Sequence, residues 1–423
     1  MTMKRTWGAI GLVSLALILG ACGPGATTET KNPEKKGDQA DLIVWEDKDK
    51  KSGIEEAVKA FEKEENVTIK LMEKAYGNQL EDLRLDGPAG TGADVITIPS
   101  DQIGTAITEG LLHELTVDSD EQSKFTEAAM KSQIVDKKVY GLPKAVETQI
   151  LFYNKELIGE NELPKTTDEW LALSKKMTAE KSEQYGLLAL WDQVYYAQGV
   201  MTPFGGYIFG EDKDGNYDPD QLGIDAEGEI KGADYIQTFY KENVFPSGLI
   251  GDQGINVLDS LFTEGKAAAV ISGPWNLEPY KKAGIDYGVK ELPLLPNGKH
   301  MSSFIGVKSY NVSSYSKNPE LAEKFVKFIT DEKNSKVRYE QTQEVPALKS
   351  LAEDKSVMEN PSTVAIAEQS KYAELTPGIT AMNSVWDPTN AALQTIATNK
   401  ATPSDALKQA ATQIKESIAA TKN

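Results

Sequence analysis

The side chains that most often carry enzyme chemistry are scarce in this chain of 423 residues. It holds two histidines, His113 and His300, and one cysteine, Cys22, which stands near the N-terminus. Two histidines supply a zinc site poorly, and an acylated Cys22 excludes a Cys–His nucleophile. No Gly-x-Ser-x-Gly elbow appears in the sequence. We therefore expect a protein that is not an enzyme and that holds no metal and no cofactor.

Carboxylates, by contrast, are abundant. There are 64 Asp and Glu against 45 Lys and Arg, which gives a formal net charge of −19. This excess argues against nucleic acid or an anionic membrane surface as a partner, because both require cationic patches. It is compatible with a neutral ligand. So many acidic residues also leave open, as a minor alternative, a carboxylate pair for glycoside hydrolysis.

Two loops match ion-binding motifs only in part. Gly87–Gly92 is rich in glycine, but no Lys-Ser/Thr follows it and it precedes a strand, so a plain turn is expected. Asp212–Asp218 places oxygen ligands at alternate positions, as calcium loops do. It lacks the glycine at the sixth position and the glutamate at the twelfth, and it suits a surface hairpin as well. The sequence leaves calcium binding by this loop open.

The thiol of Cys22 has a different chemistry. Lys4 and Arg5 precede the apolar run Trp7–Leu19, which is shorter than the roughly 20 apolar residues of a membrane span. The run ends at Leu19-Gly20-Ala21-Cys22, which resembles a bacterial lipobox. The sequence predicts a signal peptide over 1–21 and a diacylglyceryl lipid, with acyl chains such as palmitate, on Cys22. An ordinary signal cleaved near Ala21 is the alternative.

The segment after Cys22 suits a tether. Residues 22–40 are rich in Gly, Thr, Lys and Glu and show no apolar periodicity, which predicts a lipidated flexible linker. A single cysteine also excludes intramolecular disulfides, so the rest of the chain is stabilised by packing. The remaining ~380 residues exceed the usual size of one domain, and two domains are expected.

Strands and helices alternate along this body. Short apolar runs predict strands at Leu42–Trp45, Val67–Leu71, Ala93–Ile98, Thr148–Tyr153, Leu187–Leu190 and Ala267–Ser272. Helical spacing predicts helices after a capping box at Ser52–Glu55, after a cap at Thr167, and at Leu258–Glu264, Pro319–Thr330 and Ser404–Ala419. The alternation indicates an α/β fold with parallel sheets.

An ordered set of segments resembles the maltose/maltodextrin-binding proteins, the extracellular receptors of ATP-driven sugar importers. Their order and spacing match over about residues 41–420. The segments are Leu42–Trp45 with Asp47–Lys50; Ala93–Ile96, Ser100-Asp101 and Glu109–Leu112; Val139–Glu147 leading into Tyr153-Asn154-Lys155; Gly205-Gly206-Tyr207; Glu264–Ala268 through Ser272-Gly273-Pro274-Trp275; and Ser384-Val385-Trp386.

The resemblance implies a sugar site. A sugar ring needs aromatic platforms for its apolar faces and carboxylates or amides for its hydroxyls. By resemblance the platforms are Tyr195, Trp275 and Trp386, and the polar groups are Asp49, Lys50, Asp101 and Glu147. Core packing is the alternative for each aromatic residue. Asp101 also suits a helix N-cap, and Asp49 and Lys50 suit solvated charges.

The chain departs from the best-known members of that family at three positions. It has Ile98 in place of a stacking aromatic, Gln102 in place of an arginine, and Gln193 in place of an acidic residue. Loss of the arginine removes a rigid fork of donors that engages hydroxyls in pairs. The subsite that these groups build is therefore in doubt, which leaves the preferred glucan chain length open. An α-glucan is favoured, with another oligosaccharide or a polyol as the alternative.

The resemblance also implies the architecture and the partners. The fold is expected to be a two-lobed, periplasmic-binding-protein-like α/β fold with a ligand cleft between lobes, which are 41–147 plus 304–347 and 148–303 plus 348–423. Three crossings join them, near Val146–Gln149, Phe304–Lys308 and Glu344–Lys349. Ligand would favour a closed state, which the permease subunits of an ABC importer would recognise. We expect a monomer on the extracellular face of the cell membrane, held only by its lipid.

Overall fold

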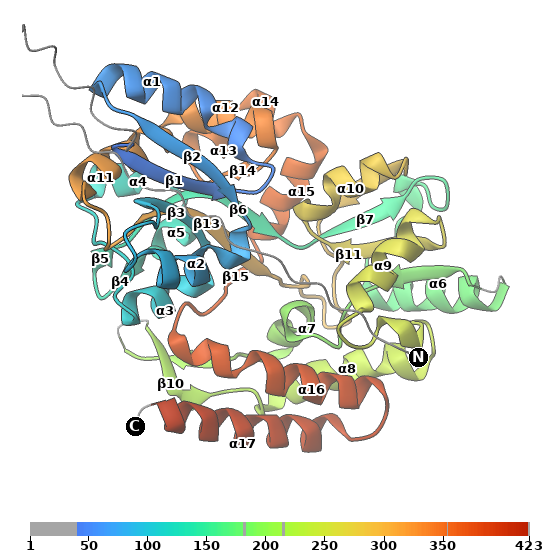
Figure 1. Cartoon of the computed structure of the whole chain (residues 1–423). Coiled ribbons are helices and arrows are strands. Elements are labelled where there is room, and N and C mark those ends of the chain that lie inside the picture. The colour runs from blue at the N-terminus through green and yellow to red at the C-terminus, as the bar shows by residue number, and fades with distance from the viewer. Residues whose placement is uncertain (1–39, 181–182, 214–215, 353, 422–423) are drawn as a thin grey trace, which may run out of the picture. The chain divides into compact units, whose positions relative to one another are not determined.

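Two β-sheets organise the part of the chain that the structure, a computed structural model, describes. That part comprises residues 40–180, 183–213, 216–352 and 354–421. The chain from Ala40 to Asn423 forms one unit (Figure 1). The predicted signal peptide, Cys22 and almost all of the predicted linker lie outside the described residues. None of the helices within the described ranges has the length and apolar character that a membrane span requires.

The larger sheet has seven strands in the order β14-β6-β13-β3-β1-β2, with β15 paired to β13. β1 lies parallel to β2 and β3, as the alternation predicts, but β13 runs antiparallel to both β3 and β6. The prediction of parallel sheets was therefore wrong for this half of the sheet. The strands are β1 Leu42–Asp47, β2 Ile69–Lys74, β3 Val95–Pro99, β6 Leu142–Thr148, β13 Phe304–Val312, β14 Val345–Pro346 and β15 Glu374–Leu375.

The second sheet has four strands in the order β12-β7-β11-β8. β11 lies parallel to β8, but β7 runs antiparallel to β11 and β12, so the prediction of parallel sheets was wrong for β7 as well. Two small antiparallel pairs, β4–β5 and β9–β10, stand apart. These strands are β4 Ile134–Val135, β5 Lys138–Val139, β7 Ile150–Asn154, β8 Tyr185–Leu188, β9 Phe209–Glu211, β10 Tyr217–Leu222, β11 Ala267–Ser272 and β12 Tyr287–Lys290.

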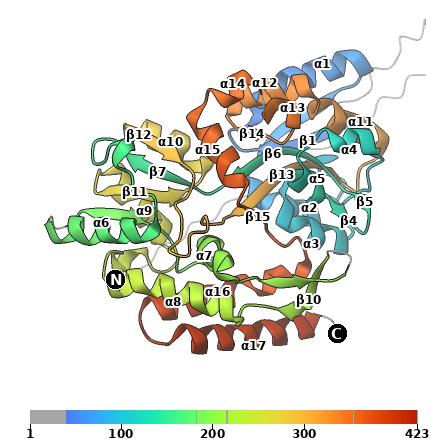
Figure 2. The same ribbon diagram turned by 180° about the vertical axis from the view of Figure 1, so that it is seen from behind.

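Helices flank both sheets, as the two opposite views in Figures 1 and 2 show. They are α1 Glu55–Glu65, α2 Gln79–Asp86, α3 Ile103–Thr108, α4 Ser119–Ser123, α5 Glu127–Lys131, α6 Thr167–Glu180, α7 Val194–Met201, α8 Glu227–Lys241, α9 Gly254–Thr263, α10 Leu277–Lys282, α11 Pro319–Ile329, α12 Glu332–Thr342, α13 Lys349–Ala352, α14 Lys355–Met358, α15 Pro361–Ser370, α16 Trp386–Ala397 and α17 Pro403–Thr421. Short 3₁₀ turns at Lys51–Gly53, Ser100–Gln102 and Pro274–Asn276 matter for the site.

Each sheet has its own apolar core, which gives the α/β fold its two lobes. One core joins β7, β8 and β11 to α8, α16 and α17, and includes Trp170 and Trp191. The others lie on the two faces of the larger sheet: one under α1 and α11 around Phe61 and Phe325, the other around Trp45 beside α2 and α3. The lobe boundaries given above stay a prediction.

Two predicted helix caps were wrong, for local reasons. Ser52 lies inside the 3₁₀ turn Lys51–Gly53, so α1 begins after Ile54 without a side-chain cap. The cap of α6 is Thr166, not Thr167. The Thr166 hydroxyl accepts from the Glu169 amide at 3.2 Å, and the Glu169 carboxylate accepts from the Thr166 amide at 3.1 Å. This reciprocal pair is a capping box one residue earlier than expected.

The two loops with partial ion-binding motifs form turns. Gly87 ends α2, and the amides of Thr91 and Gly92 donate back to the Asp86 carbonyl before β3 begins. Asp212 and Asn216 close the β9–β10 hairpin, with the Asp212 carboxylate accepting from the Asn216 amide at 3.0 Å. Residues 214 and 215 of this loop lie outside the described residues. The described residues include no group of three or more His, Cys, Asp or Glu placed to hold a metal ion.

Candidate functional site: aromatic rings and carboxylates near the crossing strands

The predicted aromatic platforms form one run of rings. The ring centroid of Tyr195 lies 6.4 Å from that of Trp275 and 6.0 Å from that of Phe304, which lies 6.3 Å from Trp386. These four residues come from the start of α7, the turn after β11, the first residue of β13 and the start of α16. Segments nearly 200 residues apart in the sequence therefore contribute to a single aromatic surface.

Exposure separates the platform tryptophans from core tryptophans. Trp45, Trp170 and Trp191 are at most 1% exposed, whereas Trp275 is 36% exposed. Trp386 is half-buried and packs at the edge of the core. Large aromatic side chains favour burial, so an indole held at the surface points to a ligand or partner. Core packing thus does not account for Trp275.

Hydrogen bonds of buried side chains hold the turn in which Trp275 stands. Asn276 donates from one amide nitrogen to the Asp259 carboxylate at 2.8 Å and to the Ser272 hydroxyl at 2.9 Å. The Tyr280 hydroxyl donates to the same carboxylate at 2.6 Å. The indole of Trp275 lies across Gly273, where a side chain would collide with the ring. Glycine at this position is therefore required for the observed ring orientation.

Tyr195 is held by contacts from two other parts of the fold. The Gln149 side chain donates to the Tyr195 carbonyl at 2.7 Å, directly after the β6 strand. The neighbouring Val194 amide donates to the Asn390 side chain at 2.8 Å, which ties α7 to the helix that begins at Trp386. Burial raises the pKa of the Tyr195 hydroxyl well above its ordinary value, and the charges of Glu147 and Asp101 add to the rise. This hydroxyl is therefore a neutral donor at physiological pH.

The charges of two predicted carboxylates, Asp101 and Glu147, act on the pKa of this hydroxyl, and the charge of Glu147 acts on the pKa of Asp101. Asp101 stands in the 3₁₀ turn after β3, and Glu147 stands near the end of β6, two strands away across β13. Burial raises the pKa of Asp101, its own and the next backbone amide lower it, and the Glu147 charge raises it again. Asp101 is not the N-cap of α3, because that position belongs to Gln102.

Tyr76 joins the same group, although the sequence reasoning missed it. Burial raises the pKa of its hydroxyl well above the ordinary value, followed by the charges of Glu147 and Asp101. Its backbone amide donates to the Asp47 carboxylate at 3.0 Å, and the Lys308 ammonium lies over its ring, 4.9 Å from the ring centroid. The charges of Asp101 and Glu147, at the C-terminal ends of β3 and β6, thus act on the hydroxyls of both Tyr76 and Tyr195.

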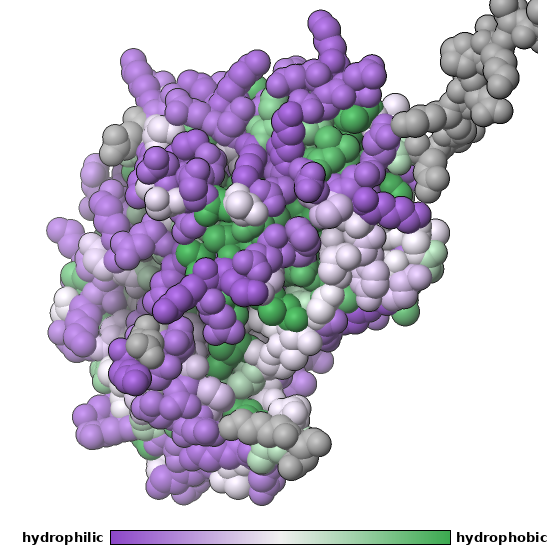
Figure 3. Space-filling view, turned by 90° about the vertical axis from the view of Figure 1, so that its left-hand side faces the viewer, coloured by the Kyte–Doolittle hydropathy of each residue, from purple (hydrophilic) through white to green (hydrophobic). Residues whose placement is uncertain are grey.

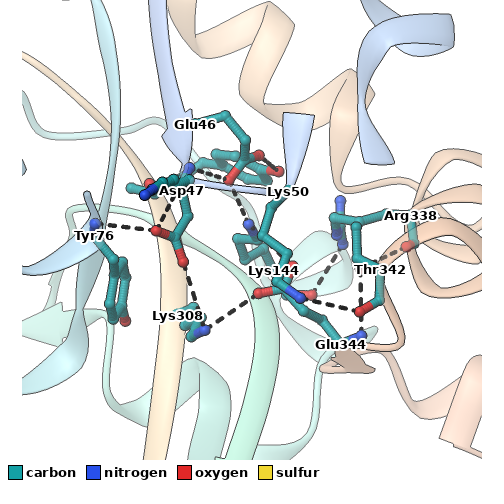
Figure 4. A network of polar contacts seen from close by, with 12 residues as sticks. Glu46, Asp47, Lys50, Tyr76, Lys144, Lys308, Arg338, Thr342 and Glu344 are labelled. Carbon is teal, nitrogen blue, oxygen red and sulfur yellow. Dashed lines mark hydrogen bonds and ion pairs between the residues drawn. The ribbon is translucent and has the colours of Figure 1, made fainter. Parts of the chain in front are cut away.

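A buried charge network lies directly behind these groups (Figure 4). The Lys144 ammonium contacts Glu46 at 2.6 Å and Glu344 at 3.2 Å, with Lys144 and Glu46 side chains fully buried. The Tyr310 hydroxyl donates to Glu46 at 2.6 Å. Burial alone would raise the pKa of Glu344, but Lys144 and Lys308 outweigh it and hold that pKa well below its ordinary value. Glu344 is therefore ionised at neutral pH.

Lys308 connects the network to the candidate site. Its ammonium lies 3.3 Å from Glu147, 3.3 Å from Glu344 and 3.9 Å from Asp47. Lys308 pairs with Ala145 in the β-ladder, while Gly306 pairs with Glu147 and Val345 with Val146. The three predicted crossing segments are thus neighbouring strands of one sheet in the structure, and each brings a charged side chain to this point.

The other two predicted polar residues lie at the edge of this network. Lys50 donates to the Thr342 carbonyl at 3.1 Å, at the end of α12, and its charge helps to lower the pKa of Glu344. Asp49 is exposed in a turn with φ +64°, and its amide donates to Glu73 at 3.1 Å. Ligand contacts by Asp49 and Lys50 stay predictions.

The three departures from the resembled family are visible in the structure. Ile98 is fully buried in the core around Trp45, so no ring occupies its position. Gln102 is half-buried, and its side-chain oxygen is buried with no hydrogen-bond partner among the described residues. Gln193 is the N-cap residue of α7, directly before the Tyr195 segment. These neutral side chains make this part of the site less polar.

Phe304, Lys308 and Glu344 were missed as site residues. All three stand at the ends of segments that the sequence analysis assigns to crossings between lobes. The signal was therefore present, but the sequence alone does not show which face of a strand meets the ligand. A separate surface hollow contains none of the predicted ligand residues; it is lined by α4, α5 and the β4–β5 turn, with Asn216 and Lys349.

Comparisons with known proteins agree with this geometry. The family model described as "Bacterial extracellular solute-binding protein" matches residues 56–365. A galactooligosaccharide-binding protein of Bacillus subtilis is 59% identical over 96% of this chain and 96% of its own length. A maltodextrin-binding protein of the same species is 35% identical over 96% and 97%.

A solved structure shares the fold in detail. A cyclo/maltodextrin-binding protein complexed with maltotetraose superposes with a TM-score of 0.83 at 35% identity, over 91% of this chain and 99% of its own. A maltose-binding protein of Listeria monocytogenes in complex with maltose gives 0.82 at 33% identity, over 89% and 97%. The chain belongs to the bacterial extracellular solute-binding proteins.

Proposed function

We propose that this chain is the extracellular sugar-binding receptor of an ABC importer. The observation that carries the proposal is the run of rings from Trp275 through Tyr195 and Phe304 to Trp386, beside the carboxylates Glu147 and Asp101. Aromatic faces stack on the C–H faces of a sugar, and carboxylates accept from its hydroxyls. Four rings in sequence suit an oligosaccharide better than a single sugar.

We favour a galactooligosaccharide as the ligand. The relative at 59% identity carries that name, whereas the relatives named for maltodextrin stand near 35% or lower. Galactose and glucose differ in the direction of one ring hydroxyl, which alters the polar contacts and preserves the apolar faces. The chain keeps the platforms Tyr195, Trp275 and Trp386, whereas Gln102 and Gln193 change polar positions and Ile98 replaces a stacking ring, and these differences fit a change of sugar.

Maltodextrin, which the sequence analysis favours, is the second candidate. The supporting observation is the likeness to the solved maltotetraose complex at 35% identity. Isothermal titration calorimetry with galactotriose, galactotetraose, maltotriose and maltotetraose decides between them. We expect binding at micromolar or lower Kd to the galactose series and at least tenfold weaker binding to the glucose series. The reverse order would assign maltodextrin, and no heat with any of the four sugars would contradict a receptor for either.

We further propose that the protein is a receptor and not an enzyme. The alternative, a surface glycoside hydrolase, would cleave the sugars used in the titration. Chromatography of each sugar after overnight incubation with the protein is expected to show it intact. Release of shorter products or reducing ends, absent from a Glu147→Gln and Asp101→Asn control, would establish the hydrolase.

Lipid attachment at Cys22 and delivery to permease subunits complete the proposal. Two relatives, from Streptococcus pneumoniae, are named as solute-binding lipoproteins of an ABC transporter. We expect mass spectrometry of the mature N-terminus to show an acylated Cys22, and Cys22→Ala to move the protein from the membrane fraction to the medium. Retention of the variant in the membrane fraction would show a different anchor.

A further inference from the structure

Lys308 is placed differently from the other buried lysine of the charge network. The side chain of Lys144 is fully buried, and its contact to Glu46 is short, at 2.6 Å. The Lys308 side chain keeps 14% of its surface exposed, and its contacts to carboxylates measure 3.3, 3.3 and 3.9 Å. Short charged hydrogen bonds measure about 2.7–2.9 Å. Lys144 therefore forms a short charged hydrogen bond, whereas all contacts of Lys308 with carboxylates are longer than such a bond.

The carboxylates around Lys308 keep it charged. Burial lowers the pKa of Lys308, but Glu147 and Glu344 outweigh it, so the pKa stands above its ordinary value. An ammonium has three protons to donate and no acceptor capacity. One proton is directed to Glu344, where the distance is 3.3 Å. The remaining donor capacity faces Glu147 and the ring of Tyr76.

The surrounding candidate ligand groups are mainly acceptors. Asp101, Glu147 and Asp47 are carboxylates, and an ionised carboxylate only accepts. A sugar hydroxyl is both a donor and an acceptor, so its oxygen also requires a donor from the protein. At the point where Glu147, Asp47 and the Tyr76 ring surround it, the charged donor is the Lys308 ammonium.

We propose that Lys308 donates a hydrogen bond to a hydroxyl of the bound sugar and helps to determine which sugar is accepted. This inference rests on the proposed sugar-binding function. Glu147 and Lys308 then engage the sugar together, the carboxylate accepting from one hydroxyl and the ammonium donating to a neighbouring oxygen. The ammonium also contacts Glu344 of the third crossing segment, so the same cation is shared between ligand and network.

The competing interpretation is that Lys308 only holds Glu147 in place. A double-mutant cycle separates the two, with Kd for galactotriose measured by calorimetry on the full-length mature protein. The variants are Lys308→Met, Glu147→Gln and both together. Lys324→Met is the control, because it removes the same charge from a lysine whose ion pair, with Glu65 at 2.7 Å, lies away from the candidate site.

We expect Lys308→Met to weaken galactotriose binding about tenfold to a hundredfold, the effect of one charge-assisted hydrogen bond. The loss should persist, at tenfold or more, in the Glu147→Gln background. Lys324→Met should leave Kd unchanged within twofold. If Lys308→Met has no effect once Glu147 is replaced, then Lys308 acts only through Glu147 and the inference is overturned.

Two further readouts make the result decisive. Thermal unfolding shows whether each variant folds. If Lys308→Met does not fold, the Kd of the double variant is compared with the Kd of Glu147→Gln instead. Neither of these two variants has an unpaired carboxylate at position 147, so the difference in their Kd values measures the contribution of Lys308. The galactotriose to maltotriose Kd ratio should also change by threefold or more in Lys308→Met, and an unchanged ratio removes the specificity role. Wild-type protein that binds neither sugar overturns the proposed function itself, whereas wild-type binding that Lys308→Met leaves intact overturns this inference alone.

Discussion

Trp275 illustrates how solvent exposure distinguishes side chains of one type. The described chain buries Trp45, Trp170 and Trp191 almost completely, where they fill the cores of the two lobes. Trp275 instead presents a face to solvent from a turn that four polar contacts fix in place. A rigid, exposed ring is a good platform because it loses little conformational entropy when a ligand stacks on it.

Replacing Trp275 by alanine should therefore weaken sugar binding without unfolding the protein. Loss of one stacking platform is expected to raise Kd about tenfold, which corresponds to ~1.4 kcal/mol. Calorimetry with galactotriose measures the change, and Tyr315→Ala serves as the control because Tyr315 is 42% exposed outside the ring cluster. Equal losses in the two variants would argue against Trp275 as a platform.

Glu229 on α8 is a buried carboxyl that the candidate site does not use. It is fully buried, and one of its oxygens accepts from Gln198 at 2.7 Å while the other has no partner among the described residues. Burial raises its pKa to about 8, against the stabilising contact with Gln198. The folded protein therefore binds this proton more tightly than the unfolded chain does.

The free energy of unfolding should accordingly fall as pH rises from about 4.5 to about 8, by at most ~1.4 kcal/mol per pH unit from this group. Glu229→Gln removes the titration and should raise Tm at pH 8 while leaving it nearly unchanged at pH 4.5. Scanning calorimetry at both values tests this. Asp234→Asn is the control, because Asp234 is an exposed carboxyl on the same helix. A Glu229→Gln variant that is less stable than the wild type at pH 8 would contradict the raised pKa of Glu229. A control variant that is more stable than the wild type at pH 8 would do so too.

Strands β6, β13 and β14 pair with one another and also hold part of the charge network. Lys144 and Lys308 lie on these strands, Glu344 lies directly before β14, and the three side chains meet in one network. Hydrophilic side chains cover most of one face of the molecule, with hydrophobic ones between them (Figure 3), so charge is common at the surface. Charge at full burial is different, because each ion must be compensated by its partners.

Lys144→Met should consequently be strongly destabilising. It leaves Glu46, whose side chain is fully buried, without its cation, and such losses cost about 3–5 kcal/mol. Urea unfolding followed by fluorescence gives the free energy directly. Lys324→Met, which removes a solvent-exposed pair, should cost less than about 1 kcal/mol. A loss below 1 kcal/mol for Lys144→Met would show that the network is not a stability element.

The molecule as a whole joins the cores of the two sheets through these strands, with ring and carboxylate residues contributed from both sheets. Phe304 opens β13 of the larger sheet, Trp275 stands in the turn after β11 of the smaller one, and Tyr195 packs against the core around the smaller sheet. A ligand that contacts residues of both groups stabilises the arrangement in which they meet. We propose hinge closure about the three crossing strands as the response to ligand.

Saturating ligand should therefore both stabilise and compact the protein. At 100 times Kd, binding adds about 2.7 kcal/mol to the free energy of unfolding, which thermal unfolding detects as a raised Tm. Small-angle X-ray scattering is expected to show a smaller radius of gyration with galactotriose than without it. Sucrose at the same concentration is the control for a non-specific effect, and a raised Tm with an unchanged radius would limit the response to local ordering.

The sequence by itself determined much of this result. Alternating apolar runs and helical spacing located the elements, with β11 predicted to the residue and β1, β3 and α11 to within a few residues. The resemblance to the maltose/maltodextrin-binding proteins pointed to Tyr195, Trp275 and Trp386, three rings that the structure brings into one run. These features are local, or depend on residue type, and so can be read along one chain.

Only the tertiary structure decided which other residues join them. Strand β13 returns from more than 150 residues beyond β6 and pairs with it antiparallel, so Phe304 and Lys308 reach Tyr195 and Glu147. Lys308 is one lysine among many in the sequence, and nothing local marks it. Its distinction comes from three carboxylates supplied by β1, β6 and the approach to β14, a combination that long-range pairing creates. Register and direction of pairing, which depend on the whole fold, therefore set the polar half of the candidate site.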